Sequence, residues 1–201
     1  KTKAILPVHL FGQPAKIDEL RKIAVSNNLI LIEDCAQAAG ATYRGLPVGS
    51  FGNLSCFSFY QTKHIVCGEG GLIATNNAKY AYALSSILNN GIKRDNLDDY
   101  DYDRIGFNYQ MTEIQAALTL AQIPRQTELN EKRREHADIY RRVLADTDIS
   151  FQEEAINTKN NYFYLTGLLP NKLHDKRDVF IKMLKVLGVP VKKLYALSLP
   201  E

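Results

Sequence analysis

The chain is 201 residues long, which is enough for one well-packed core and part of a second domain. Its hydrophobic fraction of 45% and charged fraction of 23% are those of an ordinary globular protein. The formal net charge of +3 is too small to indicate a nucleic-acid-binding protein, so no nucleic-acid partner is expected. Basic residues gather only between Glu131 and Glu135, where the flanking acids predict a solvated helix face.

The cysteines and the apolar runs set the expected compartment. Cys35, Cys56 and Cys67 have no metal-like spacing, so no metal site is expected, and their odd number favours a reducing compartment. No apolar run predicts a membrane-spanning helix, and no secretory signal opens the chain, which predicts a cytoplasmic protein with no membrane partner. The chain begins with Lys1 and enters an apolar run within a few residues, and its last residues complete no predicted helix or strand. We therefore expect the central fragment of a longer polypeptide.

The first quarter of the chain predicts a parallel βαβ unit followed by a turn-rich segment. Apolar runs at residues 4–10 and 29–32 are expected strands, and the helical spacing that begins after Pro14 predicts a helix between them. Continuously apolar strands are typical of a parallel sheet that is covered on both faces. Glycines and a proline in residues 42–52 predict turns or a hairpin.

The later elements follow from apolar runs and from helix-capping residues. Asn77 is an expected N-cap, Thr112 and Gln115 form an expected capping box, and Pro124 should kink or break the helix that they begin. The expected elements are strands at 54–59 and 71–75, a helix from Asn77 to Gly91, a long polar loop at 92–104, helices from Thr112 and at 126–144, a strand at 162–169 and a helix at 178–187.

Two polar residues follow the apolar run at 29–32: Asp34 ends the predicted strand, and Gln37 comes three residues later. In open α/β sheets, ligands bind at the carboxyl ends of the strands. Lys63 lies between another expected strand and the glycine-rich stretch 68–71. An aspartate at a strand end and a lysine in a loop are what pyridoxal phosphate needs. The amine forms a Schiff base with the aldehyde, and the carboxylate keeps the pyridine nitrogen protonated.

Each candidate residue also has a purely structural explanation. Asp34 could cap a turn, Gln37 could bond to the backbone, and Lys63 could be a surface lysine. Ser58 could donate its hydroxyl to the cofactor phosphate or be only a small strand residue, and Asn108 could donate to the phosphate or hold a turn. The glycines have neither the P-loop nor the dinucleotide-binding spacing.

Taken together, six short stretches resemble the DegT/DnrJ/StrS family of nucleotide-sugar aminotransferases. They are Pro7–Gly12, Ile32–Ala38, Gly49–Gly52, Phe57–Lys63, Gly68–Gly71 and Gly106–Ala117. The resemblance implies an α/β fold of the aspartate-aminotransferase type, fold type I. Residues 1–110 would be part of a large domain with a mixed, mostly parallel sheet that binds pyridoxal 5'-phosphate. Residues 111–145 would be linking helices, and 146–201 an incomplete small α/β domain.

The resemblance also implies a role for each candidate. Lys63 would be the Schiff-base lysine and proton shuttle, Asp34 the partner of the pyridine nitrogen, Gln37 a contact of the ring oxygen and Ser58 a phosphate contact. Asn108 would reach the phosphate of the neighbouring subunit in a homodimer with shared active sites. The implied reaction moves an amino group from an amino-acid donor, usually glutamate, to a nucleotide-linked keto sugar. One branch of the family dehydrates instead and carries histidine at the lysine position, so Lys63 favours transamination. A dehydratase-like enzyme and a truncated, non-catalytic dimerising homologue are the alternatives.

Overall fold

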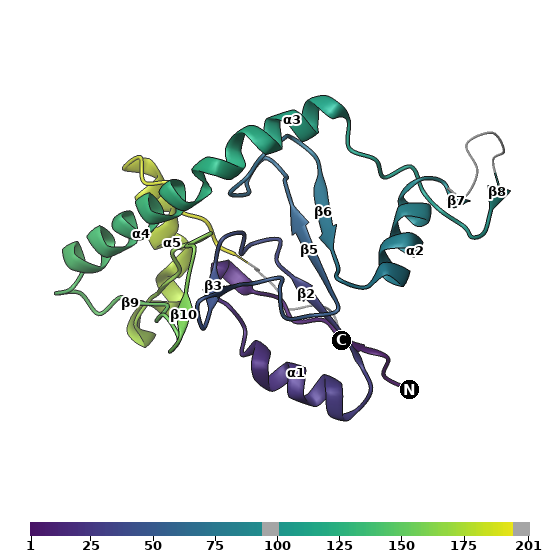
Figure 1. Ribbon diagram of the computed structural model, residues 1–201. Coiled ribbons are helices and arrows are strands. Elements are labelled where there is room, and N and C mark those ends of the chain that lie inside the picture. Colours follow the sequence, from purple (N-terminus) through teal and green to yellow (C-terminus); the bar gives the residue numbers. More distant parts are fainter. Residues whose placement is uncertain (94–100, 195–201) are drawn as a thin grey trace. The chain divides into compact units, whose positions relative to one another are not determined.

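The structure, a computed structural model that describes residues 1–93 and 101–194, contains a four-stranded sheet with the order β1-β2-β5-β6 (Figure 1). Strands β1 (Ala4–Ile5), β2 (Ile30–Asp34) and β5 (Leu54–Ser58) are parallel, and β6 (Gly71–Ala74) is antiparallel to β5. Helix α1 (Ile17–Ser26) connects β1 to β2. The predicted βαβ unit and the mixed, mostly parallel sheet are therefore confirmed.

One cluster of the hydrophobic core lies between α1 and the sheet. Ile17 and Ala24 from the helix form one cluster of buried side chains with Leu31 of β2 and with Tyr43. Leu31 and Glu33 alternate with more exposed neighbours along β2, as expected for a strand whose two faces differ. Since Asp34 pairs with residue 56 of β5, the carboxyl ends of these two parallel strands lie side by side.

A hairpin follows β2 in the segment that the sequence marked as turn-rich. Strands β3 (Thr42–Tyr43) and β4 (Leu46–Pro47) pair in antiparallel fashion, and the distant strand β10 (Thr158–Lys159) adds to β3. The pairing of β10 brings a segment from late in the chain next to the first half of the molecule.

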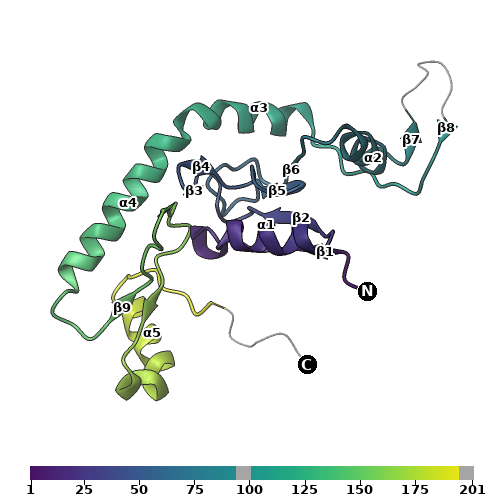
Figure 2. The same cartoon turned by 60° about the horizontal axis from the view of Figure 1, so that its bottom comes forward.

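The helices begin where their capping residues predict. The side chain of Asn77 accepts hydrogen bonds at the start of α2 (Ala78–Leu88), and Thr112 and Gln115 form the capping box of α3 (Glu113–Gln122). A 3-10 turn at Ile123–Arg125 contains Pro124 and separates α3 from α4 (Gln126–Val143), as Figure 2 shows. The kink or break expected at Pro124 is confirmed.

Two expected strands are much shorter than predicted. The run at residues 4–10 forms a strand only at β1, because Pro7 has no N–H group for a sheet hydrogen bond. The run at 162–169 forms a strand only at β11 (Gly167–Leu168), which pairs with β9 (Ser150–Phe151). Ahead of β11, the backbone N–H groups of Tyr162 and Phe163 donate to asparagine side chains instead of to a strand.

The remaining elements are short. The expected polar loop at 92–104 contains β7 (Ile92–Lys93) paired with β8 (Asp101–Tyr102), and its residues 94–100 lie outside the described part of the chain. Near the end of the chain, a 3-10 segment (Asn171–Lys176) leads into α5 (Arg177–Val186).

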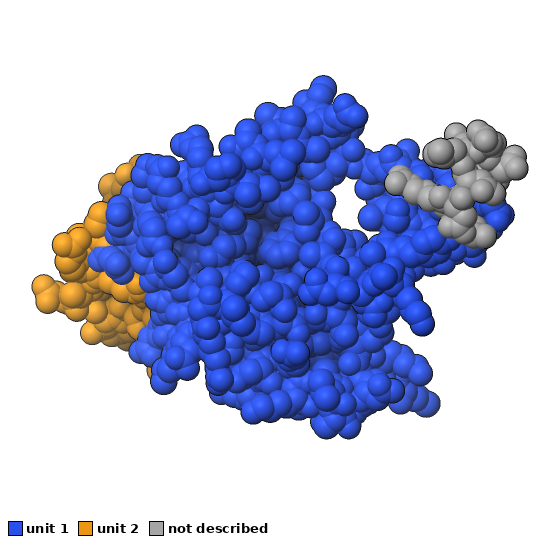
Figure 3. All heavy atoms as spheres, viewed as in Figure 1, with its two compact units in different colours: residues 1–138, 153–165 blue, residues 139–152, 166–201 orange. Residues whose placement is uncertain are grey.

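The chain divides into two units, coloured separately in Figure 3. Unit 1 comprises residues 1–138 and 153–165, and unit 2 comprises residues 139–152 and 166–201. All five candidate site residues belong to unit 1. The division into a large domain, linking helices and an incomplete small domain stays a prediction for the whole protein. Within the described ranges, no helix has both the length and the apolar character needed to cross a membrane.

Candidate cofactor site

Asp34 closes β2 at the edge of the sheet, with backbone hydrogen bonds on both sides. Its N–H donates to the carbonyl of Pro7 at 2.9 Å, and its carbonyl accepts from the N–H of His9 at 3.1 Å. The side-chain Oδ1 accepts from the N–H of Ala36 at 3.0 Å. This is the turn-capping role that the sequence left open for Asp34, but it uses one carboxylate oxygen. Among the described residues Oδ2 has no protein donor, so this oxygen can accept from a ligand.

Lys63 lies in the loop between β5 and β6. Backbone hydrogen bonds from Phe59 to Gly70 and from Gln61 to Gly68 close the base of this loop, and Gly68 has the positive φ of 89° that its turn requires. Burial lowers the pKa of the Lys63 ammonium, and the negative charge of Asp34 opposes that shift. Lys63 is therefore no ordinary surface lysine, and its amine lies within electrostatic reach of Asp34.

Gln37 follows Asp34 in the chain and Ser58 precedes Lys63, and each has a partner within the chain. The side-chain Oε1 of Gln37 accepts from the N–H of Phe11 at 2.8 Å. Ser58 is the last residue of β5, and its hydroxyl oxygen accepts from the N–H of Tyr60 at a long 3.4 Å. Both residues come from loops or strand ends at the same edge of the sheet as Asp34, since β2 and β5 are parallel.

Asn108 lies in a different part of unit 1. It forms a bridge with Asn89 at the end of α2, and the flanking Phe107 and Tyr109 bond to the backbone of residues 90 and 88. Within the described residues, Asn108 has no hydrogen bond to any of the other four candidates. Its expected contact with the cofactor of a neighbouring subunit stays a prediction.

Lys63 has an aromatic neighbourhood that the sequence did not indicate. The Lys63 Nζ lies 4.8 Å from the centre of the Phe163 ring. Phe163 packs edge-on against Tyr164 at 4.4 Å between ring centres, and Tyr164 packs against Phe11 at 5.9 Å. We call these three aromatic residues the aromatic wall. No sequence signal pairs residues 63 and 163, because their contact depends on how the late segment folds back.

His64, next to Lys63, is a buried structural residue. Its Nε2 lies 3.1 Å from the carbonyl oxygen of Asn161, so Nε2 carries the proton and donates. Burial, together with the charge of Arg133, lowers the pKa of His64 to about 4. His64 is therefore neutral near pH 7 and adds no second positive charge beside Lys63.

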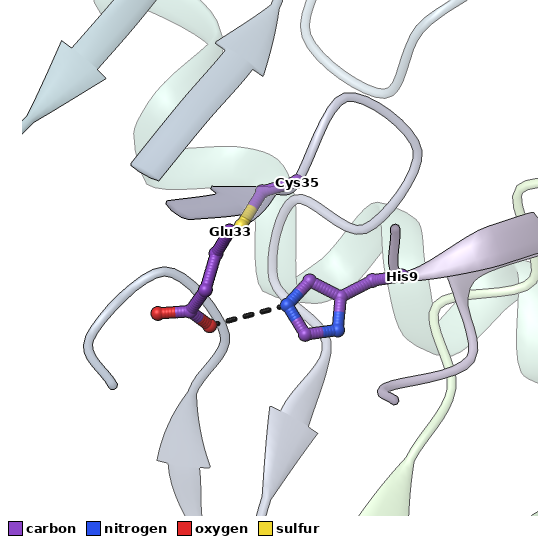
Figure 4. Close-up of side chains that lie close together, drawn as sticks. All are labelled: His9, Glu33 and Cys35. Atoms are coloured by element: carbon purple, nitrogen blue, oxygen red, sulfur yellow. Dashed lines mark hydrogen bonds and ion pairs between the residues drawn. The ribbon is translucent and has the colours of Figure 1, made fainter. Parts of the chain in front are cut away.

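His9, Glu33 and Cys35 form a buried cluster near Asp34, and their potential ligand atoms lie within 4.8 Å of one another (Figure 4). His9 Nδ1 accepts from the N–H of Ala15, so Nε2 carries the proton and donates to Glu33 Oε2 at 3.1 Å. Burial, with the nearby carboxylates, raises the pKa of the Cys35 thiol far above its usual range. A protonated Nε2 and a neutral thiol are poor metal ligands.

The Glu33 carboxylate is fully engaged by protein donors. Besides His9, it accepts from the N–H groups of Gly49 at 2.8 Å, Phe51 at 2.7 Å and Gly52 at 2.6 Å. The cluster therefore holds the turn at residues 49–52 against the end of β2, and we interpret it as structural.

The donor set at the strand ends suits pyridoxal phosphate. The site offers a partly buried amine on Lys63, a carboxylate on Asp34 with an oxygen open to a ligand, and a hydroxyl on Ser58. Together with the α/β fold and its mixed sheet, this set matches the class of fold type I transferases, which use that cofactor.

The chain belongs to the DegT/DnrJ/EryC1/StrS aminotransferase family, whose profile matches residues 1–200. It is 38% identical over 197 residues to the GDP-perosamine synthase of Caulobacter vibrioides, covering 97% of this chain and 53% of that protein. It is 42% identical over 193 residues to the GDP-perosamine synthase of Escherichia coli O157:H7, covering 90% of this chain and 52% of that protein.

A solved structure confirms the fold assignment. The crystal structure of a DegT DnrJ EryC1 StrS aminotransferase from Brucella abortus matches with a TM-score of 0.84 and 32% identity, over 98% of this chain and 52% of that chain. The family and the fold type predicted from the sequence are thus confirmed. The chain spans about half the length of the curated relatives that it matches.

Proposed function

We propose that the whole protein transfers an amino group to a nucleotide-linked keto sugar, with pyridoxal 5'-phosphate as its cofactor. One observation carries the proposal. The partly buried amine of Lys63 lies within electrostatic reach of the Asp34 carboxylate, at the edge where β2 and β5 end. The family and the two GDP-perosamine synthases support it, because those relatives are named for making a nucleotide-linked amino sugar.

Four residues of this chain would hold the cofactor. Lys63 would bind its aldehyde carbon, Asp34 its pyridine nitrogen, Gln37 its ring oxygen and Ser58 its phosphate. Asn108 would contribute from the neighbouring subunit of a homodimer. When bound, pyridoxal phosphate supplies an electron-accepting ring that stabilises negative charge on the carbon next to the transferred nitrogen.

The surroundings of Lys63 fit the two tasks of its amine. Burial lowers the pKa of Lys63, so more of the amine is neutral near pH 7 than in an exposed lysine. A neutral amine can attack a carbonyl carbon and can accept a proton. Asp34 opposes the shift and keeps the ammonium form accessible as a proton donor. Lys63 can therefore carry a proton in either direction.

The finer features of the function are part of the same proposal. An amino acid, with glutamate as our first choice, would donate the amino group, and the enzyme would work as a homodimer in the cytoplasm. A dehydratase-like homologue is the alternative. Lysine at position 63, where the dehydrating branch carries histidine, favours transamination.

Reductive trapping tests the proposal. The whole protein, loaded with pyridoxal phosphate and treated with borohydride, should carry a pyridoxyl group on Lys63, detected by mass spectrometry of its peptides. Lys63→Ala should abolish this label and the formation of an amino sugar from glutamate and a keto sugar nucleotide. Lys79→Ala, at an exposed lysine, is the matched control and should change neither result. A pyridoxyl group on another lysine would refute the assignment.

A further inference from the structure

We propose that Phe163 is a positioning residue, whose ring holds the Lys63 ammonium beside the carboxyl end of β2, where Asp34 lies. The inference rests on the proposed function for the use that the enzyme makes of this amine. Its geometric basis is the distance of 4.8 Å between Lys63 Nζ and the centre of the Phe163 ring. A cation within about 6 Å of a ring centre is attracted by the negative face of the ring.

The backbone from Asn161 to the N–H of Phe163 is tied to two loops of the site. The N–H of Phe163 donates to Oδ1 of Asn161 at 3.1 Å, and Nδ2 of Asn161 donates to the carbonyl of Ala39 at 2.9 Å. The carbonyl of Asn161 accepts from His64 at 3.1 Å. Asn161 is 1% exposed. The loop after β2 and the loop after β5 are therefore joined through Asn161, and both fix the backbone from which the Phe163 ring projects.

The ring itself is packed on two sides. Tyr164 lies against it with a ring-centre distance of 4.4 Å, and the His64 ring lies at 5.6 Å. Tyr164 in turn contacts Phe11, whose N–H binds the candidate Gln37. The aromatic wall thus connects the residue that contacts Lys63 with the backbone that holds Gln37.

Lysine needs such a contact more than the other candidates do. Its side chain has four rotatable bonds, and holding it in one place opposes its conformational entropy. Among residues 1–93 and 101–194, its ionisable and charged neighbours are Asp34 at the end of β2 and His64 in its own loop, with Arg133 of α4 acting on His64. Because His64 is neutral near pH 7, Asp34 and the Phe163 ring are the groups in the described part of the chain that favour the ammonium form. Burial is the effect that disfavours it.

The first test measures Lys63 in the whole protein freed of cofactor. An amine-specific acylating reagent is applied from pH 7 to pH 11, and mass spectrometry follows the Lys63 peptide. The labelling rate at pH 7, divided by the plateau rate at high pH, reports the neutral fraction of the amine independently of access. Phe163→Leu keeps apolar volume but removes the ring, and should raise this ratio about two- to fivefold. Phe163→Tyr keeps the ring and should retain the wild-type ratio.

Phe151→Leu, in β9 of unit 2, is the matched control and should leave the ratio unchanged. An unchanged or lowered ratio in Phe163→Leu would overturn the inference, and so would a Tyr variant that behaves like Leu. Should Phe163→Leu not fold, as judged by circular dichroism, Phe163→Met carries the same expectation.

A second measurement needs no substitution at position 163. In the wild-type protein with ¹³C-labelled lysine, the ε-CH₂ protons of Lys63, assigned with Lys63→Arg, should be shifted upfield by the Phe163 ring. Their resonance at the position of exposed lysines would overturn the inference. Both measurements use cofactor-free protein, so they are independent of reductive trapping. Failed trapping would sink the proposed function and leave the contact between residues 63 and 163 intact.

Discussion

Asp34 combines a structural and an electrostatic task in one carboxylate. Oδ1 accepts from the N–H of Ala36, and this bond shapes the turn after β2. The charge acts on the Lys63 ammonium and, in the proposed function, on the pyridine nitrogen of the cofactor. The two tasks are separable, since an amide oxygen can accept the same hydrogen bond without carrying a charge.

Asp34→Asn should therefore leave the fold intact and remove the activity. We expect kcat to fall by about 100-fold or more, the size of effect seen when one preorganised electrostatic partner of a reaction is removed. The urea midpoint should stay within the error of the wild-type value. Steady-state assays and urea titrations of the whole protein measure the two quantities. A kcat within tenfold of wild type would show that the ring nitrogen has another partner.

Glu33 depends on its charge for stability. Burial alone would raise the pKa of Glu33, but the hydrogen bonds from His9 and from the N–H groups of Gly49, Gly52 and Phe51 outweigh it and lower the pKa. A lowered folded-state pKa means that the stabilisation is present above the unfolded-state pKa of about 4.5 and is lost as the pH falls through the folded-state value.

Glu33→Gln should lower the free energy of unfolding at pH 7 by about 2–4 kcal/mol, because an amide group would face donors that now meet a carboxylate. Between pH 7 and pH 3 the variant should lose less stability than the wild type, since it lacks this titrating group. Urea titrations over that range measure both effects. Glu113→Gln, at an exposed glutamate in the first turn of α3, is the control. Parallel pH curves for wild type and Glu33→Gln would contradict the argument.

Among the elements, the turn after β1 packs closely against the segment before β11 at Gly12. Gly12 has a φ of 92°, and a Cβ built on it would lie 1.9 Å from Oδ1 of Asn161 and 2.7 Å from Oδ1 of Asn160. Gly45, in the turn between β3 and β4, has a similar φ of 78° but nothing within 4 Å of the corresponding point. Substituting each glycine by alanine therefore distinguishes the cost of backbone strain, which both variants have, from the cost of a steric collision, which only the Gly12 variant has.

Gly45→Ala should lower the free energy of unfolding by about 1–2 kcal/mol, which is the effect of an alanine at positive φ. Gly12→Ala adds a collision with buried side chains, and we expect about 2–5 kcal/mol. It should also change the labelling ratio of Lys63, because Asn161 anchors Phe163. Urea titration and amine labelling of both variants measure these effects. Equal losses of unfolding free energy in the two variants would mean that residues 160–161 move aside at no measurable cost.

Local signals predicted the elements that depend on local contacts. Thr112 and Gln115 cap α3 because a capping box is completed within four residues. The strand expected at 162–169 forms only at Gly167–Leu168, because the side chains of Asn160 and Asn161 accept from the N–H groups of residues 162 and 163, which an apolar pattern does not reveal. The proximity of Asp34 and Lys63 could be predicted, since Asp34 ends one strand of a parallel pair, Lys63 follows the other, and such strands have their carboxyl ends at one edge of the sheet.

At the scale of the whole molecule, side-chain contacts between segments far apart in the chain could not be predicted from the sequence. Phe163 meets Lys63 across one hundred positions, and Asn161 meets Ala39 across 122. The basic cluster at 131–135 shows the same limit. Its expected solvated face is wrong for Arg134, whose side chain is 23% exposed and turns toward Glu154. A charge pattern within one helix does not tell which acid elsewhere in the chain will pair with it.

Arg134 and Glu154 join the two parts of the chain that make up unit 1. The guanidinium donates through Nη1 and Nη2 to the two oxygens of Glu154, both at 2.8 Å, and through Nη2 to the carbonyl of Asn160 at 3.1 Å. Glu154 also accepts from the N–H of Asn160. This paired contact holds residues 153–165, and with them Phe163, against α4.

Glu154→Gln should lower the free energy of unfolding by about 1–3 kcal/mol, because it breaks a half-buried, two-pronged ion pair and leaves the guanidinium with weaker acceptors. Asp148→Asn is the matched control, since Asp148 pairs with Lys172 at an exposed position in unit 2, where solvent screening leaves an ion pair little effect on stability. Glu154→Gln should also shift the Lys63 labelling ratio in the direction of Phe163→Leu, because the loosened segment carries the aromatic ring. Urea titration and amine labelling of the whole protein decide the matter. A destabilised Glu154→Gln variant with a wild-type labelling ratio would show that Asn161 alone holds Phe163 over the amine.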